Sequence, residues 1–192
     1  MVDPLFLPFL DASLTANDHA RIVNTLSFME YQGARKIFKS QDEHAMDEQI
    51  LSHAAEEARH ALVFKRIALK LDPSQTTYDY IIRNSYMQTV DAASAHVHRA
   101  LAYCLTTIVV EERALAFYPL YADVLDRFAL GHGLRAIVRE EGGHLEDLFA
   151  RLGQHNTGLL QTVRAAEANA FAAFSQAVAQ TSSRSEPSIA IG

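Results

Sequence analysis

The sequence predicts an all-α protein, in which four long helices form a bundle with a long crossover connection and an extra C-terminal helix. Composition supports this class, because 49% of the 192 residues are apolar while glycine and proline number only 8 and 5, a balance typical of helical globular proteins. Apolar residues also recur every three or four positions along several stretches, which is the spacing of an amphipathic helix. Two of these stretches follow a capping box, in which Ser or Thr pairs with an acidic residue three positions later.

Length, charge and cysteine content limit the number of domains, the partners and the location of the protein. A chain of 192 residues suits a single domain with a sizeable core. A net charge of −6 provides no basic surface, so no nucleic-acid partner is expected. Cys104 is the only cysteine, which excludes an internal disulfide and a cysteine-rich metal cluster and favours a reducing, cytoplasmic location.

The apolar segments do not predict a membrane protein. The N-terminal segment is apolar but lacks the basic residues that open a signal peptide. The longest apolar run ends at Glu111, far short of the roughly 20 residues needed to cross a bilayer. No transmembrane helix and no membrane partner are therefore expected.

Residues 1–15 are expected to form an extended arm that lies over the bundle. Its Phe6 and Phe9 would occupy a groove between helices, with a membrane-surface or partner contact as the alternative. Residues 16–180 are expected to form the helical bundle, and residues 181–192 a disordered tail.

The first helix is expected to follow a capping box formed by Thr15 and Asp18. Glu30 falls within the apolar stripe of this helix. A carboxylate in such a place must be paired, protonated or bound to metal, because burying a bare charge is costly. The stripe consists of Ile22, Val23, Leu26, Ala34 and Ile37.

The second helix is expected to start at a capping box of Ser40 and Glu43 and to run to Leu71, where a proline at position 73 stops it. Its inner face includes Glu57 and His60. His53 is one turn earlier and is expected to pack in the core or lie at the helix surface, with a place beside bound metals as the alternative. Residues 74–95 then provide the crossover and the start of the third helix.

The third helix contains two adjacent carboxylates, Glu111 and Glu112. Its apolar register favours Glu112 as the inward residue, and Glu111 is the alternative because it shares a stripe with Cys104 and Leu115. The helix is expected to kink or end near Pro119. One further helical piece, residues 121–130, should follow it.

The fourth helix is expected over residues 134–152 and contains Glu141 and His144. Gly142 and Gly143 lie in its interior, where each costs about 1 kcal/mol relative to alanine. A close helix contact, a bulge or space beside bound metals would compensate for this cost. A last helix over residues 157–180 would cover the bundle or form the contact of a homodimer.

Two Glu-x-x-His motifs predict a metal site. In Glu57/His60 and in Glu141/His144, 84 residues later, the two side chains share one helix face. A glutamate on each preceding helix completes the ligand set of a dinuclear centre in a four-helix bundle. Four carboxylates and two neutral imidazoles suit two iron ions, or one manganese and one iron.

A second pair of carboxylates directly precedes the motif glutamates. Glu56 and Glu140 are placed to hold the ligand histidine of the opposite helix, since a ligand histidine needs an acceptor for its other ring nitrogen. We expect Glu140 to contact His60 and Glu56 to contact His144.

These residues resemble the ferritin-like di-iron carboxylate superfamily over about residues 16–152, and in particular its oxygenase-like branch of small di-iron oxygenases. Residues 56–60 resemble the Asp-Glu-x-Arg-His motif of bacterial multicomponent monooxygenases, with Glu in place of Asp, and residues 140–144 are similar to its second copy. The resemblance implies these metal ligands: Glu30, Glu57, His60, Glu112, Glu141 and His144.

The resemblance implies an oxidoreductase that activates O2 at a di-iron or Mn/Fe centre and oxidises a small, apolar substrate, with an external electron donor. Iron oxidation or storage is one alternative, and a non-catalytic helical binding protein is another. Tyr31, next to Glu30, is expected to have a packing role, with a radical-bearing tyrosine as the alternative.

Overall fold

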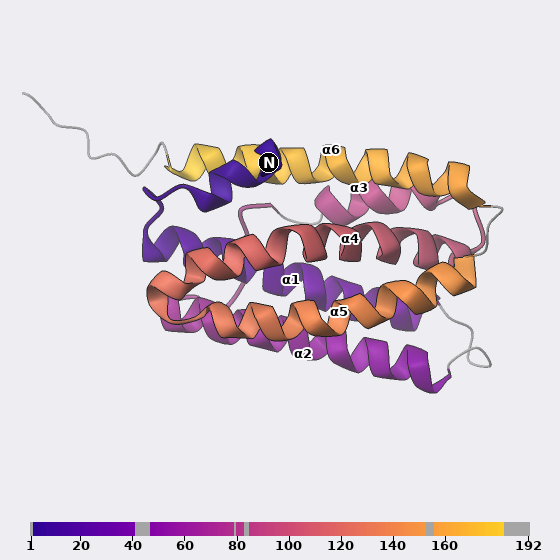
Figure 1. The fold of residues 1–192 in the computed structure, drawn as a ribbon, viewed down its shortest axis with the longest axis horizontal. Helices are drawn as coiled ribbons and strands as arrows, with labels where there is room; N and C mark the ends of the chain where they lie inside the picture. The colour runs from indigo at the N-terminus through magenta and orange to yellow at the C-terminus, as the bar shows by residue number, and fades with distance from the viewer. Residues whose placement is uncertain (1, 41–46, 79, 83–84, 153–155, 183–192) are drawn as a thin grey trace, which may run out of the picture.

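The computed structural model describes residues 2–40, 47–78, 80–82, 85–152 and 156–182 (Figure 1). Within these ranges all regular secondary structure is helical, which confirms the predicted all-α class. None of these helices combines the length and apolar character that crossing a membrane requires. The elements are η1 (Pro4–Leu10), α1 (Ala16–Ser40), α2 (Glu48–Leu71), α3 (Ser85–Ser94), α4 (Arg99–Leu125), η3 (Asp126–Phe128), α5 (Gly131–Leu152) and α6 (Thr157–Ser182).

Four long helices surround a common interior. They contact one another in the cyclic order α1, α2, α5 and α4, and each runs opposite to its two neighbours in this ring (Figure 1). Because α2 and α4 run in the same direction, the chain between them must return along the length of the molecule, as the predicted crossover requires. Helix α3 lies within this connection and packs against α6, and both also contact α4.

Two of the predicted helix boundaries depend on capping residues. The Thr15 N–H donates to Asp18 Oδ2 at 2.9 Å and the Asp18 N–H donates to Thr15 Oγ1 at 3.2 Å, which confirms the first capping box. Helix α2 is instead capped by Asp47, whose side chain accepts from the Ile50 N–H at 2.9 Å. Glu43 of the other predicted box lies outside the described residues.

Helix α4 continues through Pro119 to Leu125, so of the predicted kink or end near this proline, the end is wrong. The chain then reverses through η3 and through Ala129, which has a left-handed backbone (φ 58°). Helix α5 begins at Gly131, earlier than predicted. A Cβ atom at this glycine would lie 2.3 Å from the Ala122 carbonyl oxygen, so the tight turn from α4 to α5 requires glycine.

The N-terminal segment is a short 3-10 helix, so the predicted extended conformation is wrong. The Asp3 side chain caps it by accepting from the Leu5 N–H at 2.9 Å, and proline occupies its first position. The predicted burial of Phe6 and Phe9 is confirmed. Their rings pack between α4 and α6, with the Phe9 centroid 4.8 Å from that of Phe117 and 5.0 Å from that of Phe174.

The C-terminal helix ends two residues beyond its predicted end. Helix α6 extends to Ser182, and residues 183–192 of the predicted tail lie outside the described residues. Tyr31 is 41% exposed and stacks on Tyr78, as its predicted packing role requires. Gly142 and Gly143 are exposed on a regular stretch of α5, and no predicted close contact or bulge occurs there.

Replacing Gly142 or Gly143 by alanine is expected to stabilise the protein by up to about 1 kcal/mol each, because alanine favours the helix and no neighbouring atom lies within 4 Å of the added Cβ. In a domain of this size that corresponds to a rise in melting temperature of about 2–4 °C per substitution. Thermal unfolding followed by circular dichroism measures it. An unchanged or lower melting temperature would show that these glycines serve another purpose.

Candidate metal centre

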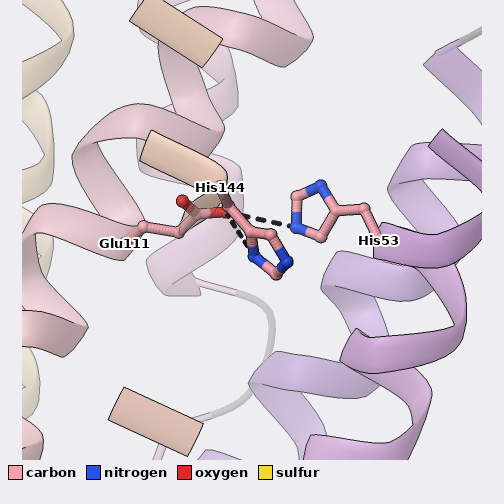
Figure 2. A group of neighbouring side chains, drawn as sticks. All are labelled: His53, Glu111 and His144. Atoms are coloured by element: carbon pink, nitrogen blue, oxygen red, sulfur yellow. Dashed lines mark ion pairs between the residues drawn. The ribbon is translucent and has the colours of Figure 1, made fainter. Parts of the chain in front are cut away.

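Titratable side chains from all four long helices converge in the interior of the molecule. They form two groups, and within each group the potential ligand atoms lie within 4.8 Å of one another. Five of the six predicted ligands belong to these groups. The first group is Glu30, Glu57, His60 and Glu141, and the second is His53, Glu111 and His144, shown in Figure 2.

Glu112 does not lie in this cluster, so the favoured register of the third helix is corrected. Its carboxylate is half-buried and accepts a hydrogen bond from Arg164 Nε on α6 at 2.8 Å. Glu111, only 2% exposed, takes the inward position. The apolar pattern of the sequence could not determine how α4 is rotated about its own axis, because this helix packs against the bundle on one side and against α6 on the other.

Each motif histidine is held by a carboxylate from the opposite helix, as predicted. His60 Nε2 lies 2.7 Å from Glu140 Oε2, and His144 Nε2 lies 2.5 Å from Glu56 Oε2. In one contact the histidine lies on α2 and the carboxylate on α5, and in the other the histidine lies on α5 and the carboxylate on α2. A carboxylate accepts the Nε2 proton in each case, so the Nδ1 atoms that face the cluster are available as ligand atoms.

Glu141 lies between the two groups. Its Oε1 is 3.0 Å from His60 Nδ1 and its Oε2 is 3.3 Å from His144 Nδ1. Two of the three remaining carboxylates lie further out, one beside each histidine. Glu30 Oε2 is 3.9 Å from His60 Nδ1, and Glu111 Oε1 is 3.7 Å from His144 Nδ1. The two halves of the cluster therefore repeat the same Glu and Glu-x-x-His arrangement.

His53 adds a third imidazole, which departs from its expected packing or surface position and matches the alternative. Its Nε2 lies 3.2 Å from Glu111 Oε1 and 3.3 Å from Glu57 Oε1, and its Nδ1 lies 2.7 Å from the Tyr103 hydroxyl. Figure 2 shows one carboxylate oxygen of Glu111 facing both His53 and His144. The spacing of His53, Glu57 and His60 on one face of α2 was a usable signal for this placement.

Three atoms in the cluster make no well-formed hydrogen bond, although His60 Nδ1 and Glu111 Oε1 each have a charged neighbour within 3.2 Å. Among the described residues, His60 Nδ1 and both carboxylate oxygens of Glu111 are the buried side-chain polar atoms that lack a hydrogen-bond partner. Such groups are rare in folded proteins because leaving them unsatisfied costs free energy. Cations bound between these atoms would satisfy all three. The residues present therefore fit a dinuclear metal centre.

The cluster also shifts the pKa values of its members. Burial, together with the charges of Glu57 and Glu141, raises the pKa of Glu30 well above its usual value. Burial raises the pKa of Glu111 to about 7. Burial alone would lower the pKa of His53, but the nearby Glu111 and Glu57 carboxylates raise it to about 10. Without metal, the cluster therefore retains protons that bound cations would displace.

Two further residues that contact the cluster were not predicted. The Tyr118 hydroxyl donates to Glu30 Oε1 at 2.5 Å, and Tyr118 lies two helical turns after Glu111, a spacing that could have indicated it. Gly33 lies against Glu57, because a Cβ atom at Gly33 would be 2.5 Å from Glu57 Oε2. This close approach depends on how α1 and α2 pack and has no clear signature in the sequence.

An apolar cavity adjoins the cluster. Its volume is about 50 Å³. Carboxylates of the cluster, among them Glu30 and Glu111, form one end. The remaining wall comes largely from apolar side chains of α1, α3 and α4. These include Met29, Ile37, Met87, Val110 and Ala114.

Comparisons of the chain with protein-family models, with curated protein sequences and with solved structures find no match.

Proposed function

We propose that this protein is a ferritin-like oxidoreductase that uses a dinuclear metal centre, di-iron or Mn/Fe, to activate O2 and oxidise a small, apolar organic substrate. The observation on which this rests is the buried cluster of four carboxylates and three imidazoles beside an apolar cavity. The order of ligands along the chain also supports it, because a glutamate helix precedes a Glu-x-x-His helix in each of two antiparallel hairpins.

The donor set suggests how the ions would be held. Glu30 and His60 would help to hold one ion and Glu111 and His144 the other, and Glu141, which lies 3.0 and 3.3 Å from the two histidines, would supply a further carboxylate. Four carboxylates balance the charge of two divalent ions. Oxygen-rich ligation with imidazole suits iron and manganese. The other two members of the cluster, Glu57 and His53, would supply the remaining ligands.

When bound, the ions would supply the binding and reduction of O2, with electrons from an external donor. The chain's own residues perform the supporting tasks. Tyr118 holds the Glu30 carboxylate through its hydroxyl, while Glu56 and Glu140 fix the tautomer and orientation of the two motif histidines. The apolar wall of the cavity excludes water and holds an organic substrate beside the ligands.

The cavity favours an organic substrate over iron storage, because iron oxidation alone needs no apolar space beside the ligands. Iron-loaded protein supplied with a reductant should consume O2 faster when apolar test substrates are added, and oxidised product should accumulate. The double substitution Glu57→Ala/His60→Ala should abolish both. Iron oxidation with no effect of any substrate, in a large hollow assembly, would instead support the ferritin-type alternative.

Replacing Gly33 by alanine is expected to weaken metal binding at least tenfold, because the added methyl group would displace the Glu57 carboxylate from its present position. The matched control is Gly158→Ala on α6, where the added Cβ meets no atom within 4 Å. Competition with a metal-binding dye measures both affinities. Equal affinities in the two variants would contradict the placement of Glu57 among the ligands.

Metal binding is expected to strengthen with pH between about pH 6 and 8. Burial raises the pKa of Glu111 to about 7, and the nearby carboxylates raise that of His53 to about 10. Both groups must lose their protons to bind a cation, so protons compete with the metal at low pH. The affinity for Mn(II) should rise at least tenfold over one pH unit. Calorimetry in buffers of different ionisation enthalpy should also detect proton release, and a pH-independent affinity would contradict this account.

A further inference from the structure

A second hollow lies outside the apolar cavity, and the two meet at shared residues. The outer hollow is lined by six residues, of which three are basic and one is acidic: Gln32, Arg35, Lys36, Lys39, Met87 and Asp91. Lys36 and Met87 also line the inner cavity. These two side chains therefore mark one of the places where the cavity beside the metal centre adjoins a surface hollow, since His53 and Tyr103 are shared with another hollow in the same way, and the hollow at Lys36 is basic in a chain of net charge −6.

Lys36 is the one lysine or arginine among the residues that line the inner cavity. Its ammonium group pairs with Asp91 of α3, and the side chains of the two residues are 20% and 47% exposed. Burial lowers the pKa of Lys36, and the attraction of Asp91 offsets this only in part. Because Arg35 and Lys39 line the same hollow and Asp91 is its one acidic residue, a second anion beside Lys36 would be stabilised.

The cavity between Lys36 and the metal ligands is apolar. Glu30 and Lys36 are six residues apart on α1, which separates them by about 9 Å along the helix axis. The cavity thus has a cation at its mouth, aliphatic and thioether side chains along its walls and metal ligands at its inner end. A molecule that matches this order has an anionic head and an apolar chain.

We propose that the substrate is an apolar monocarboxylate whose carboxylate pairs with Lys36 while its chain extends inward to the metal centre. This inference rests on the proposed function. The opposite orientation would leave the apolar chain at the basic mouth and Lys36 without an added anion. Asp91 already balances part of the positive charge of Lys36, so a ligand with a single negative charge suits this site.

Binding of octanoate and of 1-octanol to the Mn(II)-loaded protein under nitrogen tests the proposal. Calorimetry should show octanoate binding about tenfold more tightly than 1-octanol, as a charge-assisted contact implies. Lys36→Gln should remove this difference without changing the affinity for 1-octanol. Lys70→Gln, which removes the same charge from an exposed position on α2, should leave it intact. Asp91→Asn should tighten octanoate binding severalfold, because the competing carboxylate is gone.

Three results would overturn the proposal. Equal affinities for octanoate and 1-octanol would exclude recognition of the charge. Octanoate binding that needs Mn(II) but is unaffected by Lys36→Gln would show that the carboxylate binds the metals. Tighter binding of octyl phosphate than of octanoate would assign the mouth to a phosphate. Metal analysis of the same samples tests the proposed function separately, because absence of two Mn(II) ions per chain would reject the metal centre whatever octanoate does.

Discussion

Replacing Glu111 by glutamine is expected to remove one metal ion per chain, whereas the same change at Glu112 should leave both ions bound. Glu111 is buried, and its Oε1 faces both His53 and His144 (Figure 2). Glu112 is half-buried and pairs with Arg164 instead. Metal content after equilibrium dialysis against Mn(II) measures the difference.

The two variants are matched, because each neutralises one carboxylate on the same turn of α4. Burial already raises the pKa of Glu111 to about 7, so a neutral amide there should cost the metal-free protein little stability. Thermal unfolding of the metal-free variants checks this. Equal metal loss in both variants, or loss in Glu112→Gln alone, would contradict the assignment of Glu111 to the metal centre.

Metal binding is expected to raise the melting temperature by about 10 °C or more. Ligands from four helices meet only in the folded protein, so free Mn(II) at a thousand times its dissociation constant should add about 4 kcal/mol for one site. In a domain of this size each kcal/mol corresponds to about 2–4 °C. Thermal unfolding with Mn(II), and again after a chelator is added, measures the shift.

Calcium provides the control for this measurement. Ca²⁺ takes oxygen ligands in large numbers, whereas the cluster offers three imidazoles beside its carboxylates. Calcium at the same concentration should therefore stabilise the protein much less than manganese. A melting temperature that neither ion changes, or that both raise equally, would contradict a transition-metal centre.

Helical periodicity was sufficient to predict much of the cluster. A glutamate and a histidine three residues apart must share a helix face, so the spacing alone paired Glu57 with His60 and Glu141 with His144 correctly. The glutamates that directly precede Glu57 and Glu141 point sideways, toward the neighbouring helix. For that reason Glu56 and Glu140 reach the histidines of the opposite helix, as predicted.

Features that depend on packing between helices were not predictable in the same way. The choice between Glu111 and Glu112 turned on the rotation of α4, which is covered on two sides, and only the presence of Arg164 on α6 explains the outward residue. Gly33 is close to Glu57 because of the α1–α2 contact distance. Pro119 was tolerated inside α4, where local propensity alone predicted a break.

The most direct test of the metal centre is an anomalous-scattering map from crystals of the Mn(II)-loaded protein. The proposed centre predicts two manganese peaks per chain among α1, α2, α4 and α5, one beside His60 and one beside His144. A map with no peak in this cluster, or with manganese only at surface carboxylates such as Glu112, would contradict it.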